Sequence, residues 1–225
     1  MEKRTKKWIK ILIIALLVIL FISFFFVLVH EIFKKNATVI DNSVLDYFKN
    51  HIINPTLTSW MKFFTFMASG MVITTGYIVL LFSLFRKNLN DAFLKVLFTG
   101  IGSGLLIYVS KLYYHRERPL EPLIDPLKTF SFPSGHTALG LVFYGTLTYM
   151  VWRSTLKKGI KIILTVLFII LVLGIGFSRI YLRAHFPSDV LGGFCVGASW
   201  LLCCYYIFRI EGKELYTSKY FKWMD

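Results

Sequence analysis

The sequence predicts an all-α integral membrane protein, with six transmembrane helices in one bundle and an amphipathic interfacial segment between the first and the second. Three observations support this fold class. Of the 225 residues, 56% are hydrophobic and 17% are charged, and the mean hydropathy of +0.64 lies outside the usual range of soluble domains. Six stretches are apolar and approach the roughly 20 helical residues that cross about 30 Å of hydrocarbon. The basic residues border these stretches.

The six expected spans follow one another with short connections. They lie near residues 9–30, 62–85, 93–113, 134–152, 160–178 and 188–208. The third and the fourth reach membrane length when Lys95 and His136 lie at the interfaces. Because no Pro/Gly/Ser-rich linker or repeat separates the spans, we expect one domain over residues 1–225. Close helix packing is expected at two glycine pairs with four-residue spacing: Gly100 with Gly104, and Gly193 with Gly197.

The first span follows a basic stretch, MEKRTKKWIK, that resembles the start of a secretory signal. Its apolar core is too long for a signal and no small-residue cleavage site follows, so we expect an uncleaved anchor. Six spans leave both termini on one side, which collects sixteen of the 26 Lys and Arg residues. The positive-inside rule then predicts a multi-pass cell-membrane protein with cytoplasmic termini. Residues 30–62, 111–133 and 179–189 would lie outside.

The longest outer segment, over residues 37–59, is expected to be more than a loop. Apolar residues recur there every four positions, which indicates a helix lying in the interface: Ile40, Val44, Phe48 and Ile52. Pro55 is expected to end this helix. Whether the helix gates substrate entry or only connects two spans is left open.

Two classes of partner are not favoured by the sequence. The net charge of +14 does not indicate nucleic-acid binding, because that requires a soluble basic face and here the positive charges border apolar segments. The three cysteines have no spacing typical of a disulfide framework or a zinc site, so we expect free thiols and no metal: Cys195, Cys203 and Cys204.

Ionisable residues stand at the ends of the third to the sixth spans. By parity these four helix ends share the outer side, and ionisable groups at such a depth suggest a function by default: Lys111, His136, Arg179, His185 and Asp189. We interpret five other basic side chains as extending to lipid headgroups: Lys34, Lys35, Lys49, Arg116 and Lys128.

Three cations are expected to gather at that level. Lys111 and Arg118 are seven residues apart, two turns if the helix continues, so both side chains can point the same way, and Arg179 comes from another span. Like charges this close require an anion between them, and guanidinium groups match phosphate oxygens. A further anion site is expected where the fourth span begins, from an N-cap side chain and free backbone N–H groups: Ser134, Gly135 and His136.

The two histidines suggest different roles. His185 and Asp189 have i,i+4 spacing, with Pro187 suited to the first turn of the last span, so the carboxylate can reach one imidazole nitrogen. The other nitrogen is then an oriented nucleophile. His136 approaches from another helix and could protonate a leaving oxygen.

Three stretches in order resemble a known signature. KLYYHRERP (111–119) fits Lys-x6-Arg-Pro, FPSGH (132–136) contains Pro-Ser-Gly-His, and SRIYLRAHFPSD (178–189) fits Ser-Arg-x5-His-x3-Asp. This is similar to the tripartite signature of the type 2 phosphatidic acid phosphatase superfamily, which also includes vanadium haloperoxidases. Among its members, the chain most resembles small bacterial membrane enzymes of the phosphatidylglycerophosphatase B and undecaprenyl diphosphate phosphatase type.

The resemblance implies a phosphatase that needs no metal and no cofactor. His185 would attack phosphorus to form a phosphohistidine, Asp189 would orient it, and His136 would donate a proton to the leaving group. The phosphate oxygens would be bound by Lys111, Arg118, Ser134, Gly135 and Arg179. The implied substrates are lipids in the bilayer, phosphatidylglycerophosphate or undecaprenyl diphosphate or both, which would lose a terminal phosphate at the outer membrane face.

Other interpretations are weighed beside this one. Arg183 lies one turn from Arg179, and it either contacts the second phosphate of a diphosphate or faces lipid headgroups. A membrane transporter with an outward-facing anion site is the alternative function, but it would need ionisable residues near the midplane. A vanadate-dependent peroxidase is less favoured because those relatives are soluble. Lipid preference and oligomeric state are left open by the sequence.

Overall fold

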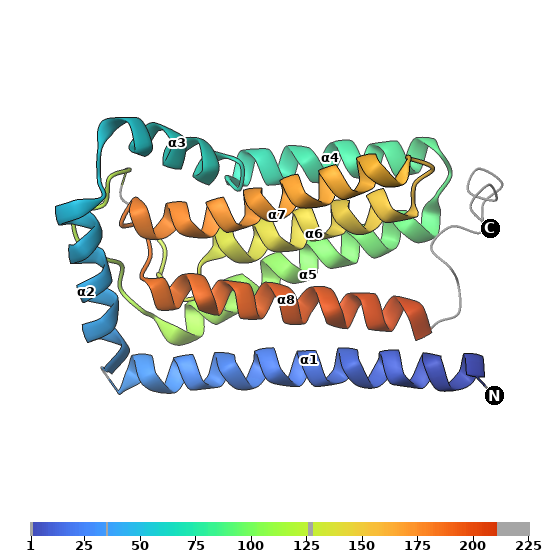
Figure 1. Ribbon diagram of the computed structural model, residues 1–225, viewed down its shortest axis with the longest axis horizontal. Coiled ribbons are helices and arrows are strands. Elements are labelled where there is room, and N and C mark those ends of the chain that lie inside the picture. The colour runs from blue at the N-terminus through green and yellow to red at the C-terminus, as the bar shows by residue number, and fades with distance from the viewer. Residues whose placement is uncertain (1, 35, 126–127, 211–225) are drawn as a thin grey trace.

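The protein is a bundle of α-helices (Figure 1). The computed structural model describes residues 2–34, 36–125 and 128–210. Within these ranges the helices are α1 (Glu2–Phe33), α2 (Asn36–His51), α3 (Pro55–Phe66), α4 (Gly70–Arg86), α5 (Asn90–Tyr114), α6 (Gly135–Arg153), α7 (Lys158–Tyr181) and α8 (Pro187–Ile210). No strand occurs in the described ranges, which confirms the all-α class for that part of the chain.

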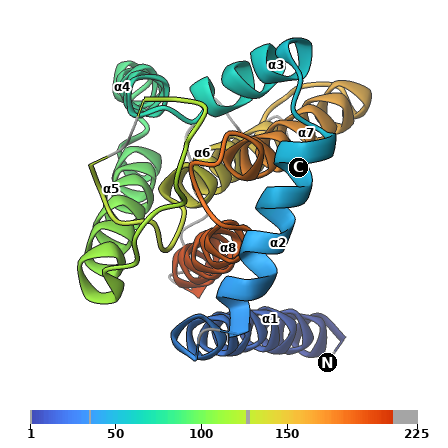
Figure 2. The ribbon, with the colours of Figure 1, turned by 90° about the vertical axis from the view of Figure 1, so that its left-hand side faces the viewer.

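Most of the described helices run lengthwise, and α2 stands across one end of them. α1 and α4 to α8 follow the long axis of the molecule, and α2 crosses one end of the bundle (Figures 1 and 2). α6 contacts α5, α7 and α8, while α1 packs against α8 from outside. At the end crossed by α2, α5 and α7 end and α6 and α8 begin. These are the four helix ends that we expected to share one side.

The described helices support a multi-pass membrane protein. Four are long and apolar enough to cross a membrane, namely Ile11–Phe33 within α1, α5, α7, and Pro187–Phe208 within α8. The pair of α3 and α4 is a fifth candidate, bent by 41°. α6 is not among them, although it contacts four other helices, α4, α5, α7 and α8. Because those neighbours bury much of α6, it needs less apolar surface toward lipid. The count of six spans stays a prediction.

The stretch expected to form one span over 62–85 is divided in the structure. A short break separates α3 from α4, and Ser69 caps α4 there by accepting a hydrogen bond from the N–H of Val72 at 3.3 Å. Pro55 begins α3, so the expectation that it would end the preceding helix is wrong in detail. Proline suits a first helical turn because its missing N–H would have no partner there, and Asn54 caps the same helix.

α2 occupies the segment expected to be an interfacial helix, but with a different face inward. Ile40 is 67% exposed, whereas Asp41 and Leu45 are buried. The other end of the expected apolar face packs on the buried cluster near the ends of α3 and α7, through Phe48 and Ile52. Asp41 takes the inner position because charged and polar partners surround it there, Arg116 and Ser188 among them. An interfacial position of α2 in a membrane stays a prediction.

α6 and α8 approach each other closely at the ends that carry the site. A Cβ atom at Gly193 would lie 2.7 Å from the carbonyl oxygen of Ser134, and one at Gly197 would lie 3.0 Å from that of Ala138. The close packing expected at this glycine pair is therefore confirmed. At the other pair, Gly104 has open space beside it, so that expectation was wrong for this residue.

Candidate active site

The turn between α7 and α8 carries the candidate nucleophile. His185 precedes α8, and Asp189 lies in the first turn of that helix, which begins at Pro187. The two side chains are 1% and 0% exposed. Nδ1 of His185 lies 3.4 Å from Oδ2 of Asp189, so the i,i+4 contact expected from the spacing is present.

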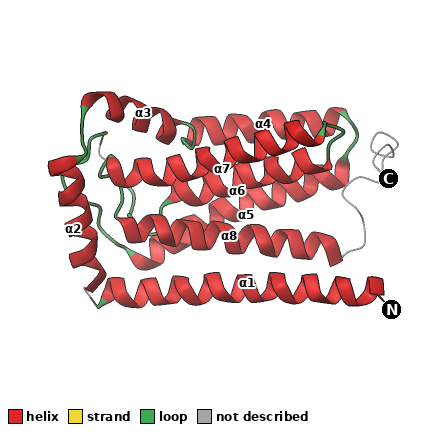
Figure 3. Ribbon diagram, in the orientation of Figure 1, coloured by secondary structure: helices red, strands yellow, loops and turns green. Residues whose placement is uncertain are grey.

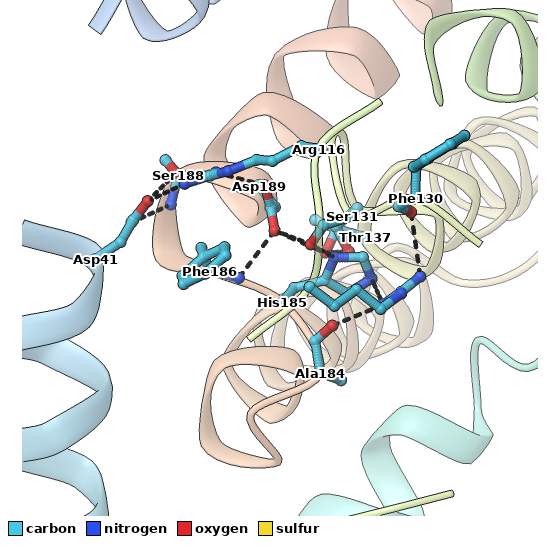
Figure 4. A network of polar contacts seen from close by, with 12 residues as sticks. Asp41, Arg116, Phe130, Ser131, Thr137, Ala184, His185, Phe186, Ser188 and Asp189 are labelled. Carbon is cyan, nitrogen blue, oxygen red and sulfur yellow. Dashed lines mark hydrogen bonds and ion pairs between the residues drawn. The ribbon is translucent and has the colours of Figure 1, made fainter. Parts of the chain in front are cut away.

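Hydrogen bonds around this pair fix the orientation of the imidazole (Figure 4). A terminal nitrogen of Arg118 lies 3.1 Å from Nε2 of His185. A guanidinium only donates, so Nε2 carries the lone pair and Nδ1 carries the hydrogen that faces Asp189. The same carboxylate oxygen accepts from the Ser131 hydroxyl and from the N–H of Phe186 at 2.9 Å. The lone pair of the imidazole is thereby directed toward the cations of the site.

The environment of His185 favours the neutral imidazole. Burial lowers the pKa of His185 well below its ordinary value of 6.5, and the positive charges of Arg179, Arg118 and Lys111 lower it further. A neutral imidazole keeps the Nε2 lone pair that a nucleophile needs.

Lys111 and Arg118 shape the loop between α5 and α6, which is green in Figure 3. The ammonium of Lys111 donates to the carbonyl oxygens of Phe130 and Ser131, the second at 3.2 Å. Arg118 donates to the carbonyl oxygens of Thr129 at 2.7 Å and of Ala184 at 2.6 Å. Both cations are thus held beside the two motif segments that precede α6 and α8.

Arg179 is a buried cation whose hydrogen-bond donors are only partly used. It is 1% exposed, and one terminal nitrogen donates to the hydroxyl of Thr65 in α3. Its Nε and its other terminal nitrogen are buried and have no hydrogen-bond partner among the described residues. A buried guanidinium with unused donors is costly, and an anion that accepts from them would remove the cost.

The start of α6 brings backbone N–H groups to the same place. Ser134 is the N-cap residue as expected, but its side chain makes no capping bond. Its hydroxyl instead accepts from Thr137 at 3.0 Å, and its N–H donates to the carbonyl oxygen of Asp189 at 2.9 Å. The N–H groups of Gly135 and His136 lie in the first turn of α6, at the positive end of the helix, where they have no acceptor within the helix. The charges of the three cations reach His136 as well as His185.

Several residues of the site were missed or misread in the sequence. Arg116 was expected to extend to headgroups, but its side chain is 9% exposed and pairs with Asp189 at 2.6 Å and with Asp41 of α2 at 2.7 Å. Thr65 and Ser131 were not singled out, because a lone hydroxyl residue in an apolar sequence carries no signal of its partner.

Arg183 lies apart from the three cations. Its guanidinium donates to the carbonyl oxygens of Leu120 at 3.3 Å and of Leu45 at 3.2 Å, and it lies 4.0 Å from Asp46. These partners connect the turn after α7 to α2. The expectation that Arg183 contacts a second phosphate stays a prediction, and its present partners do not favour it.

The arrangement suits an oxyanion such as phosphate. Arg118, in the loop after α5, lies against the lone pair of His185, and the charges of Lys111 in α5 and Arg179 in α7 act on both His185 and His136. In the described part of the chain no three His, Cys, Asp or Glu residues lie close enough together to hold a metal ion.

Comparison with known proteins places these residues in a family. The sequence model of the PAP2 superfamily matches residues 92–213, which include all three motif stretches. The chain is 37% identical over 116 residues to phosphatidylglycerophosphatase B of Bacillus subtilis (strain 168), covering 50% of this chain and 56% of that protein. It is 31% identical over 86 residues to YbjG of Escherichia coli (strain K12), named as a putative undecaprenyl-diphosphatase, covering 38% of this chain and 39% of that protein. The chain thus spans about half the length of these relatives or less.

Solved structures agree with this assignment. A transmembrane PAP2-type phosphatidylglycerolphosphate phosphatase from Bacillus subtilis superposes with a TM-score of 0.79 at 25% identity, over 88% of this chain and 98% of that one. LpxE of Aquifex aeolicus superposes with a TM-score of 0.53 at 28% identity, over 74% of this chain and 94% of that one. The motif residues, the family match over more than half of the sequence and the shared fold together show that the chain belongs to the PAP2 superfamily.

Proposed function

We propose that the protein is a lipid phosphate phosphatase that works through a phosphohistidine at His185. The observation that carries this proposal is the orientation of the imidazole, whose Nε2 lone pair faces Arg118 while Asp189 lies against Nδ1. The unused donors of Arg179 support the same conclusion, because a bound phosphate would satisfy them. The alternative of a transporter has no such support, since the charged residues of the site lie near the ends of α5 and α7 and the starts of α6 and α8.

The reaction would proceed in two displacements. Nε2 of His185 attacks phosphorus, the bond from phosphorus to the lipid oxygen breaks, and His136, which takes up a proton when the phosphate anion offsets the charges of the nearby cations, gives that proton to the oxygen. Water then attacks the phosphohistidine, His136 takes a proton from it, and the bond between phosphorus and nitrogen breaks to release inorganic phosphate. Through both steps Arg118, Arg179 and Lys111 would stabilise the charge on the phosphate oxygens.

The names of the relatives support two first substrates. They are phosphatidylglycerophosphate and undecaprenyl diphosphate, and both carry a terminal phosphate on a lipid that stays in the bilayer. We further propose that the site faces the extracytoplasmic side and that both termini are cytoplasmic, on the strength of the charge asymmetry of the sequence. Labelling of single cysteines placed in the loop between α5 and α6, in intact cells, tests that orientation.

The decisive experiment measures phosphate release by the purified protein in detergent from a panel of lipid phosphates. We expect release that is inhibited by vanadate and persists with a metal chelator, and a transient phosphate adduct on His185 that is trapped when samples are quenched rapidly in alkali. His185→Ala should lower kcat by roughly four orders of magnitude or more, the scale of losing the central residue of a catalytic group. Full activity in this variant would exclude the mechanism.

A further inference from the structure

Arg116 lies between two buried carboxylates that come from distant parts of the chain. One terminal nitrogen lies 2.6 Å from Oδ1 of Asp189, and the other lies 2.7 Å from Oδ2 of Asp41 in α2. The two acids are 0% and 3% exposed at the side chain. A buried ion cluster of this kind costs desolvation energy, so it persists only where its geometry is well satisfied.

The cluster is held from several directions (Figure 4). The hydroxyl of Ser188 accepts from Arg116 at 2.7 Å and donates to Asp41, and the N–H of Ser188 donates to the other oxygen of Asp41 at 3.0 Å. The guanidinium also lies over the ring of Phe186, 4.3 Å from its centroid. Asp41 thereby binds α2 to the first turn of α8, which carries Asp189.

The two oxygens of Asp189 have separate tasks. Oδ2 faces His185 and accepts from Ser131, whereas Oδ1 accepts from Arg116. Arg116 therefore fixes the rotation of the carboxylate that in turn fixes the imidazole. Without Arg116, nothing among the described contacts would hold Oδ1.

Asp41 balances the charge of Arg116. One guanidinium between two carboxylates leaves a net charge of minus one, which faces His185. If Asp41 were neutral, Arg116 would offset Asp189 fully, and the imidazole would lose the negative charge that favours formation of a bond from Nε2 to phosphorus.

We propose that Asp41 and Arg116 are positioning residues of the reaction and that α2 completes the active site through them. This role rests on the proposed phosphatase function, because it acts through the pair of His185 and Asp189. Asp41 lies outside the residues 92–213 that match the family, so this part of the site comes from a segment that the motifs do not include.

The test compares kcat and KM of Arg116→Gln, Asp41→Asn and the double variant on the best lipid phosphate. We expect kcat to fall roughly 10- to 100-fold in Arg116→Gln and about 10-fold in Asp41→Asn, the scale for residues that orient a reacting side chain. KM and inhibition by inorganic phosphate should stay unchanged, because the cations that bind phosphate are untouched. Since Asp41 acts through Arg116, the double variant should be no slower than Arg116→Gln alone.

Conservative variants and a control complete the test. Asp41→Glu keeps the negative charge and should therefore recover part of the kcat that Asp41→Asn loses. If Asp41 only held the helix in place, kcat would not depend on the charge at this position. Lys49→Gln breaks the exposed ion pair between α2 and Glu121 and should leave kcat unchanged. Three outcomes would overturn the proposal. The losses of kcat could multiply in the double variant, KM could rise as much as kcat falls, or Lys49→Gln could lose as much kcat as the two variants. If the wild type released no phosphate from any lipid, the phosphatase function itself would be contradicted. The variants test only the role of Asp41 and Arg116.

Discussion

Two groups of charged side chains flank His185, and they differ in how fully their donors are used. On the side of α2, both terminal nitrogens of Arg116 are bonded to carboxylates. On the phosphate side, Arg179 is equally enclosed but keeps two buried nitrogen atoms without partners in the described structure. The first group is complete without a ligand and can only position. The second group keeps unused donors, which is why we propose that it receives the substrate.

The largest expected effect comes from replacing each arginine by methionine. Arg116→Met leaves two buried carboxylates without their shared cation, so we expect the free energy of unfolding to fall by about 3–5 kcal/mol. Arg179→Met removes a charge that has few partners, and we expect stability in the absence of ligand to stay the same or to rise. Denaturant titration in detergent, followed by tryptophan fluorescence, measures both changes.

Vanadate provides the second half of this comparison. It should stabilise the wild type against unfolding but leave Arg179→Met unaffected, because the unused donors are where the anion binds. Equal destabilisation by the two substitutions, or full stabilisation of Arg179→Met by vanadate, would show that the two arginines do not differ in the way inferred.

The contact of α6 with α8 should be the next most sensitive feature. A Cβ atom at Gly193 would meet the carbonyl oxygen of Ser134 at 2.7 Å, so Gly193→Ala has to push the start of α6 away from Asp189. We expect a loss of about 1–3 kcal/mol in stability and a lower kcat. Gly104→Ala is the matched control, because open space surrounds that position and alanine suits a helix better, by about 0.5–1 kcal/mol. Similar behaviour of the two variants would contradict this account.

Much of this site could be predicted from the sequence, for a physical reason. Helix parity brings the ends of distant spans together, so the order and length of the apolar stretches suffice to place Lys111, Arg179 and His185 at one level. The i,i+4 spacing likewise led to Asp189. These are local or periodic relations, and the backbone alone fixes them.

The α2 side of the site could not be predicted in the same way. Asp41 looked like part of the polar face of an amphipathic helix, and Arg116 looked like a surface cation. Only the packing of α2 across the bundle turns both side chains inward, and packing between distant segments leaves no spacing in the sequence. For the same reason the break between α3 and α4, which places Thr65 near Arg179, was not anticipated.

The pH dependence of stability should reflect the neutral state of His185. Its pKa in the folded protein lies below the ordinary 6.5, so the unfolded chain binds more protons in the interval between the two values. The contribution of His185 to stability is therefore fully present above pH 6.5 and falls as the pH drops toward the folded pKa, by up to about 1.4 kcal/mol per pH unit. His185→Asn should have a shallower slope between pH 7.5 and 5.5 in the same denaturant titration. Identical slopes would argue against a buried neutral imidazole.

The smallest expected effect distinguishes the two interpretations of Arg183. Its donors bind carbonyl oxygens of Leu45 and Leu120, so Arg183→Ala should weaken the attachment of α2 and affect monophosphate and diphosphate lipids alike. We expect the ratio of kcat/KM between the two substrates to change by no more than roughly twofold, about 0.5 kcal/mol. Contact with a second phosphate would instead lower diphosphate turnover selectively, by roughly 10- to 100-fold for a lost charge-assisted hydrogen bond. A selective loss would therefore move Arg183 from the α2 side of the site to its phosphate side.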